Sequence, residues 1–224
     1  MEKCLGRRAY DLTLMWKTRW PNRIVFVLCL LPLVWLGWKW YQHDLGVNQI
    51  ETVARFTGRW TLRLLLLSLA ITPLRRLRGL NNLIRFRRML GLFTFFYGCL
   101  HGLHYFALDA QWNWTVIRED LTFRRFFIAG FVALMLMVPL AATSFNRAIR
   151  WLGAARWQAL HRSVYAVAAL AVLHFFWMRA GKQDFAEVAV YAAILGGLLG
   201  WRLWRWLKRP MRNGAVGMVS ARDR

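Results

Sequence analysis

The chain has 224 residues, of which 58% are hydrophobic and 16% aromatic, with 14 tryptophans. Lysine and arginine outnumber the acids by 32 to 10, which gives a net charge of +22. On a soluble protein that charge would suggest a nucleic-acid partner, but the apolar runs are too long for a soluble domain and no nucleic-acid recognition motif is present. We therefore exclude nucleic acid and expect an integral membrane protein. The cysteines form no CxxC pair, so we expect neither a disulfide framework nor a cysteine zinc site.

The chain begins with a basic segment that leads into an apolar one. Residues 1–23 are polar and basic, and an apolar run follows at 24–38. This order resembles a signal peptide, but no small-x-small cleavage site follows, so we expect a retained first helix. Polar residues fill 42–57, which we expect to connect this helix to a second, shorter apolar run at 60–72.

Four further apolar runs complete the pattern. The clearest is 89–108, which has no formal charge and is long enough to span a bilayer. Residues 109–125 are polar and aromatic, which predicts a loop with a short interfacial piece. The remaining runs are 126–144, 159–178 and 188–201. We therefore predict an all-α integral membrane protein, a bundle of six transmembrane helices.

The distribution of charge orients these six spans. With the N-terminus inside, the inner segments hold 23 of the 32 lysines and arginines, whereas seven of the ten acids lie outside. The positive-inside rule then places both termini in the cytoplasm. Basic segments on that side can also hold membrane lipid head groups or a phosphorylated cofactor. We expect a cytoplasmic segment at 1–23, a membrane domain at 24–204 and a basic cytoplasmic tail at 205–224.

Three histidines lie in the predicted spans, where ionisable residues are costly and often functional. His161 and His174 share the run 159–178, and about 13 helical steps separate them by roughly 20 Å, so one lies near each membrane face. On an ideal helix they point about 140° apart and need not bind identical partners. His101, in the run 89–108, falls at the depth of His174. Two neutral imidazoles facing each other suit the two axial positions of a b-type haem.

The residues around His101 leave alternatives open. Gly98 and Gly102 flank it and would let a flat macrocycle approach the backbone, although glycines in membrane helices also serve helix packing. An intramembrane histidine can likewise be a hydrogen-bonded packing residue. His104 follows His101 by three residues on nearly the same helix face, so periodicity alone does not choose between the two.

Four segments of the chain resemble a known family. These are RRMLGLFTFFYGCLH, which ends at His101, RWQALHRSVYAVAALAVLH, which ends at His174, and FTGRW and ITPLRRL upstream. They are similar to segments of the MsrQ/YedZ family, the haem-binding membrane subunits of a bacterial periplasmic methionine-sulfoxide reductase system. That family is related to the ferric reductase and NADPH-oxidase transmembrane domain. The resemblance implies haem b and flavin mononucleotide (FMN) as cofactors.

By position, the resemblance makes His101 and His174 the axial ligands of an outer haem. His161 matches a histidine that the family also uses for haem, which makes it a possible ligand of a second haem. The wider superfamily has a histidine where this chain has Arg87, so the partner of His161 is left open between a second haem, a flavin and a quinone. His104 is not part of the family motif.

The sequence thus predicts a transmembrane electron-transfer subunit rather than a self-sufficient enzyme. Without a GxGxxG nucleotide-binding motif, we do not expect the chain to take hydride from NAD(P)H unaided. The resemblance implies that electrons come from the quinone pool or a cytoplasmic flavin reductase. They would cross the bacterial inner membrane to a periplasmic molybdopterin-containing catalytic subunit that repairs oxidised periplasmic proteins, with residues 109–125 as its candidate docking surface. The alternatives are a ferric or metal reductase with the same haem, and a transporter or assembly subunit without a redox centre.

Overall fold

The computed structural model describes residues 20–76, 80–181 and 183–208, so most of the basic segment 1–23 and of the tail 205–224 lies outside the described residues. Within the described residues every regular element is a helix, as predicted. The long helices are α2 (Trp20–Tyr41), α3 (Gln49–Leu74), α4 (Ile84–His104), α6 (Arg125–Ala142), α9 (Val164–Ala180) and α10 (Ala186–Leu207). The shorter elements are η1 (Asn81–Leu83), the π-helix η2 (Tyr105–Asp109), α5 (Trp114–Phe123), α7 (Asn146–Leu152) and α8 (Ala154–His161).

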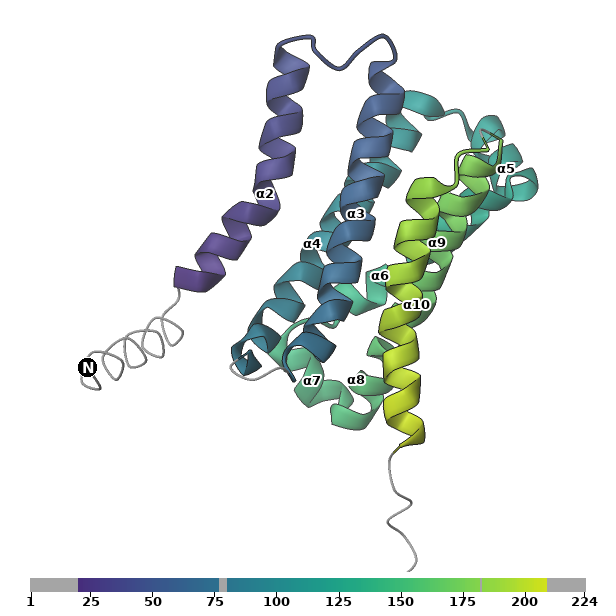
Figure 1. Ribbon diagram of the computed structural model, residues 1–224. Coiled ribbons are helices and arrows are strands. Elements are labelled where there is room, and N and C mark those ends of the chain that lie inside the picture. The colour runs from purple at the N-terminus through teal and green to yellow at the C-terminus, as the bar shows by residue number, and fades with distance from the viewer. Residues whose placement is uncertain (1–19, 77–79, 182, 209–224) are drawn as a thin grey trace, which may run out of the picture.

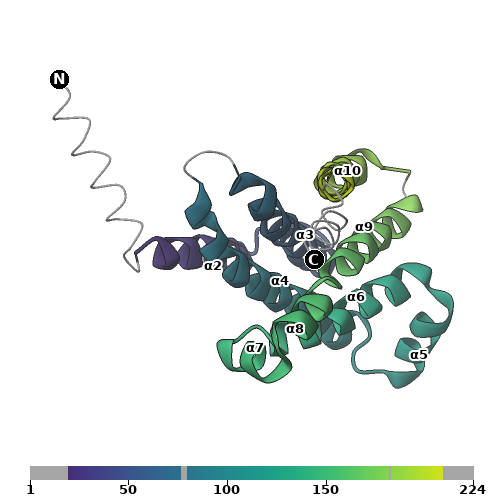
Figure 2. The same ribbon diagram turned by 90° about the horizontal axis from the view of Figure 1, so that it is seen from below.

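The long helices lie side by side, and the short ones gather at the two ends of the bundle (Figure 1). α5 lies at the upper end in that view, and α7 and α8 lie at the lower end; we name these the α5 end and the α7–α8 end. Seen from the α7–α8 end, α2 lies beside α4 at one edge and α10 lies beside α9 at another (Figure 2). The segment 109–125, expected to be a loop with a short interfacial piece, contains the ten-residue helix α5.

α3 is the central helix, because it contributes to both apolar cores found among the described residues. Its Leu65 packs with residues of α6, α9 and α10, among them Val167. Its Leu64 packs on the other side with Tyr97 of α4 and Cys29 of α2. The Tyr97 hydroxyl also donates a hydrogen bond to the Cys29 carbonyl at 2.9 Å, which joins α4 to α2. Burial of apolar side chains on two faces of α3 therefore fixes the other long helices around it.

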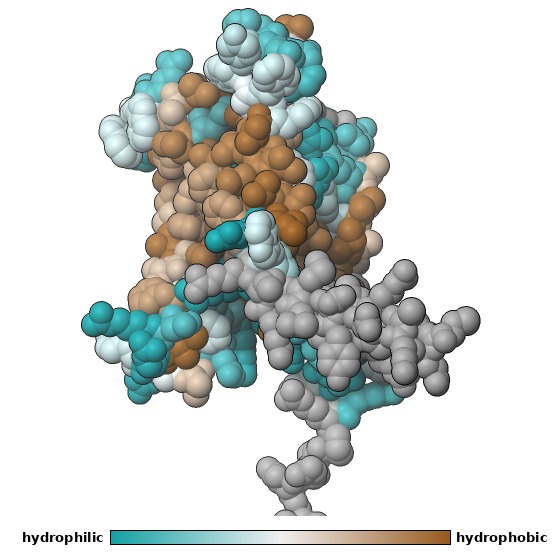
Figure 3. All heavy atoms as spheres, turned by 90° about the vertical axis from the view of Figure 1, so that its left-hand side faces the viewer, coloured by the Kyte–Doolittle hydropathy of each residue, from teal (hydrophilic) through white to brown (hydrophobic). Residues whose placement is uncertain are grey.

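Four helices in the described part of the chain are long and apolar enough to cross a membrane. They are Trp20–Tyr41, Arg125–Ala142, Ala154–Ala180 taken through α8 and α9, and Ala186–Leu207. Figure 3 shows the apolar side chains as a belt between two hydrophilic ends of the molecule. This pattern is that of a multi-pass membrane protein. α3 and α4 are also long, but charged residues lower their mean hydropathy, so the predicted count of six spans is not established by these helices.

The polar stretch 42–57 is helical over its second half, which differs from the expected connection. α3 begins at Gln49, and the side-chain oxygen of Asn48 accepts a hydrogen bond from the backbone N–H of Glu51 at 3.1 Å. Glu51 then pairs with Arg55 one turn later. Because these bonds satisfy the polar groups locally, the helix starts about three turns before the apolar run. The added turns bring α3 alongside α4 at the level of the histidines.

Residues 159–178 form parts of two helices, where one continuous helix was expected. α8 ends at His161, and α9 begins after a turn that includes Ser163. The Ser163 hydroxyl donates to the Leu160 carbonyl at 2.8 Å, and the Ser163 N–H bonds the same carbonyl at 3.0 Å. These short-range bonds replace the regular helical ladder. Arg162 and Ser163 keep right-handed helical dihedral angles, so one tight turn joins the two helices, and the angle between the two histidines is no longer that of one ideal helix.

Candidate functional site

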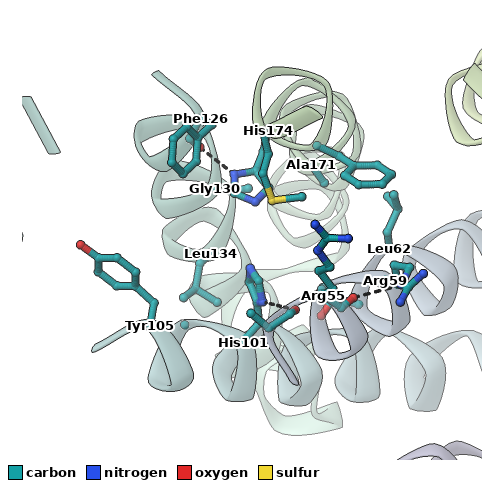
Figure 4. A pocket seen from close by; sticks show the side chains of 18 of the residues that line it. Arg55, Arg59, Leu62, His101, Tyr105, Phe126, Gly130, Leu134, Ala171 and His174 are labelled. Atoms are coloured by element: carbon teal, nitrogen blue, oxygen red, sulfur yellow. Dashed lines mark hydrogen bonds between the residues drawn. The ribbon is translucent and has the colours of Figure 1, made fainter. Parts of the chain in front are cut away.

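His101 and His174 meet between α4 and α9, as their predicted depths required. Their ring centres are 6.1 Å apart and their ring planes are inclined by 82°. Both rings line a cavity of about 300 Å³ formed mainly by apolar residues of α3, α4, α6 and α9. We call it the histidine-pair cavity, and Figure 4 shows the two imidazoles on opposite sides of it.

Each imidazole of the pair is held through its Nδ1 atom by a backbone carbonyl. His101 Nδ1 lies 3.0 Å from the carbonyl oxygen of Ala54 on α3, and His174 Nδ1 lies 2.6 Å from that of Phe126 on α6. A carbonyl oxygen only accepts hydrogen bonds, so Nδ1 is the protonated nitrogen in both rings. Nε2 of each neutral ring therefore keeps its lone pair and is available as a metal ligand.

The spacing of the pair fits a single metal ion between two axial imidazoles. Metal–imidazole bonds are about 2 Å long and the ring centre lies roughly 1 Å from the nitrogen, so two rings on one metal have centres about 6 Å apart. No group of three or more His, Cys, Asp or Glu side chains within the described residues could hold a metal ion. The pair therefore suits a metal that brings its equatorial ligands with it, as the iron of a haem does.

Glycines face both imidazoles from the neighbouring helices. A Cβ atom on Gly130 of α6 would lie 2.7 Å from His174 Nδ1, and one on Gly58 of α3 would lie 3.1 Å from His101 Cε1. Gly98 and Gly102, which the sequence singled out, line the histidine-pair cavity but face other side chains, with Leu134 of α6 nearest to both. The glycines that make room for the rings are thus on α3 and α6.

Arginine side chains line the histidine-pair cavity toward the α5 end. Arg55 and Arg59 extend from α3 beside the cavity (Figure 4), and Arg179 lines it from α9. Their carboxylate partners come from other turns and helices: Arg55 pairs with Glu51, and Arg59 Nη1 lies 3.8 Å from Glu187 Oε1 of α10. The cavity therefore combines apolar walls with one charged end, where these arginines and the carboxylates of Glu51, Asp109 and Glu187 line it together. Apolar walls and a polar end suit a flat apolar ligand with polar groups on one edge, whose carboxylates the arginines could bind.

His104 lines the same cavity but does not face either member of the pair in a ring contact. It is buried, and its Nδ1 lies 3.8 Å from Asp109 Oδ2. Its ring nitrogens make no hydrogen bond of good geometry among the described residues, although the backbone of Ile50 lies close to the ring. Its position three residues after His101 places it nearer the α5 end, away from the opposing imidazole. Geometry thus selects His101 over His104 as the partner of His174, which periodicity could not do.

Tyr105 connects this cavity to α5. Its ring lines the cavity, and its hydroxyl donates to Asp120 Oδ2 at 2.6 Å. Asp120 is 4% exposed, and its other oxygen lies 3.0 Å from Arg124 Nε. A buried carboxylate bonded to both a phenol and a guanidinium fixes the orientation of α5 over the cavity.

His161 lies in a separate cavity of about 610 Å³ toward the α7–α8 end, which we call the His161 cavity. Arg87, Arg88 and Arg162 line this cavity as well. The His161 ring stacks on Trp157, with ring centres 4.0 Å apart. No second histidine lines the cavity, so the structure does not bring His161 together with the other two.

The hydrogen bond of His161 implies the opposite tautomer to that of the pair. Its Nε2 lies 3.0 Å from Thr143 Oγ1, and that hydroxyl already donates its hydrogen to the Pro139 carbonyl at 2.7 Å. The hydroxyl therefore accepts from His161, whose Nε2 must carry the hydrogen. In this arrangement Nε2 is not free to bind a metal.

The two cavities share one wall. Leu65 of α3, Met137 of α6 and Val167 of α9 line both cavities. Only one layer of apolar side chains therefore separates the space beside the histidine pair from the space beside His161. Two cofactors in these spaces would be close, and water would be excluded from the region between them.

The family comparisons agree with this geometry. The model of the ferric reductase like transmembrane component matches residues 57–172, which include His101 and His161 and end two residues before His174. A protein of Polaromonas naphthalenivorans, the "protein-methionine-sulfoxide reductase heme-binding subunit MsrQ", is 51% identical over 199 residues, covering 87% of this chain and 91% of the relative. The chain belongs to the MsrQ family.

Other members of the MsrQ family show similar likeness. The protein with the same name in Ralstonia nicotianae is 50% identical over 201 residues, covering 89% of this chain and 92% of the relative. The one in Rhodospirillum rubrum is 50% identical over 179 residues, covering 80% and 85%. No solved structure shows a significant match to the chain.

Proposed function

We propose that this chain is a membrane-embedded haem b subunit that carries electrons to a periplasmic methionine-sulfoxide reductase. The observation that carries the proposal is the pairing of His101 and His174, with both Nδ1 atoms held by carbonyls and both Nε2 atoms free. The printed names of the relatives, haem-binding subunits of protein-methionine-sulfoxide reductase, support the same assignment. A haem bound there supplies reversible one-electron chemistry at its iron.

The residues of the histidine-pair cavity have distinct parts in this function. His101 and His174 would hold the haem iron from both sides, which leaves no open axial position for substrate. Arg55 and Arg59 would receive the haem carboxylates at the α5 end, and burial of the rings keeps water from the iron. With both imidazoles held for the iron, the chain would transfer electrons and would leave methionine-sulfoxide chemistry to another subunit.

We further propose six membrane spans, with both termini in the cytoplasm of a bacterium and the protein in its inner membrane. The arginines on α3 have partners within the bundle, for example Arg63, which donates to the Tyr191 hydroxyl at 3.0 Å. Such pairing lets α3 cross a membrane despite its charges. All seven acids of the described residues lie at the α5 end, and the arginine-rich segments lie at the other. The α7–α8 end would then be cytoplasmic. Its arginines would contact anionic lipid head groups.

For the His161 cavity we propose FMN as the occupant. Its arginines Arg87, Arg88 and Arg162 offer charge-assisted hydrogen bonds to a phosphate, and Trp157 and His161 offer aromatic surface for a flavin ring. These residues would hold the flavin beside the shared wall, and its chemistry would link a two-electron donor, a quinol or a cytoplasmic flavin reductase, to one-electron transfer. A second haem bound by His161 is the competing proposal. It is disfavoured because Nε2 of His161 carries a hydrogen and is not free to bind iron.

The partner would be a periplasmic molybdopterin-containing catalytic subunit that docks on α5. Large side chains of this region are exposed, including Trp112, Trp114 and Phe123. The bond from Tyr105 to Asp120 holds this surface directly over the histidine-pair cavity. With the surface in this position, the edge of the haem would lie close to the docked subunit.

The visible spectrum of the purified protein, expressed with sufficient haem, tests the proposal. We expect a Soret band of low-spin haem in the wild type and its loss in both His101→Ala and His174→Ala. His43→Ala is the matched control, because His43 lies in the loop between α2 and α3. A wild-type protein without a Soret band would remove the redox function and favour a transporter or assembly subunit. Oxidation of the reduced protein by ferric chelates, but not by the periplasmic subunit, would favour a metal reductase.

A further inference from the structure

Each imidazole of the histidine pair is bonded to a neighbouring helix in the same way, once on α3 and once on α6. A backbone carbonyl accepts the hydrogen of Nδ1, and a glycine follows that carbonyl by four residues. On α3 the carbonyl of Ala54 accepts from His101, and Gly58 follows four residues later. On α6 the carbonyl of Phe126 accepts from His174, and Gly130 follows four residues later. The two segments share no other feature of sequence beyond this spacing.

Helix geometry explains why the glycine stands at that spacing. The carbonyl of residue i already accepts the N–H of residue i+4, so the side chain of residue i+4 lies beside its second lone pair. α3 shows this directly, because the hydroxyl of Thr57 reaches the Val53 carbonyl at 2.8 Å and that of Thr61 reaches the Thr57 carbonyl at 2.9 Å. Where residue i+4 is glycine, no side chain covers the second lone pair of the carbonyl, and an imidazole from the neighbouring helix can bond to it.

The surroundings of the glycines separate this role from ordinary helix packing. At both Gly58 and Gly130, the three heavy atoms nearest to an added Cβ are all ring atoms of the facing histidine. No backbone or other side chain of the neighbouring helix comes as close. The missing Cβ therefore makes room for the imidazole and not for helix contact.

We infer that Gly58 and Gly130 are positioning residues that let the two axial imidazoles bond to backbone carbonyls. We call each pair of carbonyl and glycine a seat: Ala54 with Gly58, and Phe126 with Gly130. This inference rests on the proposed haem site and adds to it what fixes the ligands. Each seat holds Nδ1 as the hydrogen-bond donor and directs Nε2 into the cavity. The bond from Nδ1–H to a carbonyl also raises the basicity of the ligand, which favours ferric over ferrous iron. The seats thus set both the orientation and the strength of the ligands.

The two seats differ in how closely the imidazole approaches the helix, so the two glycine variants should differ in the size of their effect. The added Cβ would approach His174 to 2.7 Å at Gly130, against 3.1 Å from His101 at Gly58. The hydrogen bond is also shorter in the first seat, 2.6 Å against 3.0 Å. Displacement of the ring, and any change in haem properties that follows, should be larger for Gly130→Ala than for Gly58→Ala.

The test compares these two variants with Gly37→Ala on α2 and Gly197→Ala on α10, where an added Cβ meets nothing within 4 Å. The readouts are the electron paramagnetic resonance g-values of the low-spin ferric haem and its midpoint potential. We expect shifted g-values and a raised potential for both seat variants, with the greater shift for Gly130→Ala. The control variants should match the wild type. Wild-type g-values and potential in Gly130→Ala would overturn the inference.

A double variant covers the case in which Gly130→Ala does not fold. If the added methyl group acts only by striking the imidazole, Gly130→Ala should lower thermal stability far less in a His174→Ala background than alone. Equal loss in both backgrounds would show a packing role and overturn the inference. This comparison needs no bound haem, so it still tests the seat if the wild type lacks low-spin haem, a result that would refute the proposed function instead.

Discussion

The histidine-pair cavity and the His161 cavity hold their imidazoles by different means. Backbone carbonyls hold His101 and His174, whereas the side chain of Thr143 holds His161. The first arrangement leaves Nε2 free in both rings, and the second occupies Nε2 and leaves Nδ1. Position in a membrane helix therefore does not by itself make a histidine a metal ligand. The partner of the other ring nitrogen decides which atom is offered, and to what.

The widest difference between the cavities should appear when one histidine of each is removed. We expect His174→Ala to lose the low-spin haem signal while keeping bound flavin. We expect His161→Ala to keep the haem-to-protein ratio of the wild type while losing flavin, because its ring stacks in the cavity but offers no free Nε2. The measurement is haem and flavin content per protein after purification in detergent. A haem ratio that falls by half in His161→Ala would show a second haem there and break the comparison.

A smaller effect should follow from charge in the His161 cavity. Arg87→Gln removes a cation that lines the cavity, and a hydrogen bond to a charged group contributes about 1.5–3 kcal/mol. We therefore expect FMN to bind about tenfold or more weakly, as measured by titration of flavin fluorescence. Arg75→Gln is the matched control, since Arg75 follows α3 at the same end of the bundle but does not line the cavity. An equal loss in both variants would indicate general surface charge rather than a phosphate site.

The smallest effect is expected for His104, which sharpens the assignment within the histidine-pair cavity. Its ring is buried, but its nearest charged neighbour is Asp109 and it does not face His174. His104→Phe keeps the volume of the ring, so the low-spin spectrum should survive with wild-type haem content. Visible spectra of this variant and of His101→Ala, recorded side by side, provide the check. Complete loss of the signal in His104→Phe would reopen the choice of ligand on α4.

The sequence predicted the parts of the molecule that depend on pattern over many residues. Long apolar runs gave the helices, and matched depth along two of them gave the meeting of His101 with His174. Depth is readable because each helical residue advances the chain by a fixed rise. The family resemblance added the MsrQ assignment, which the comparisons establish.

Apart from the meeting of His101 with His174, the sequence did not predict which helices contact one another, or through which residues. Gly58 and Gly130 lie on helices other than those of the histidines they face, and a single sequence does not show which helix faces touch. Gly98 and Gly102 drew attention instead because they are near His101 in sequence. The start of α3 was missed because its polar first turns are satisfied by local bonds, which hydropathy does not detect. The turn at Ser163 was missed because one hydroxyl ended the helix inside an apolar run.

That turn between α8 and α9 also bears on how such proteins evolve. In one continuous helix, inserting or deleting a single residue between His161 and His174 would rotate one relative to the other by about 100°. The tight turn at Ser163 is the place where such a change would least disturb α9, which holds His174 against the Phe126 carbonyl. The residues around His161 could then change without disturbing the pair. The His161 cavity would thereby be freer to diversify than the histidine-pair cavity.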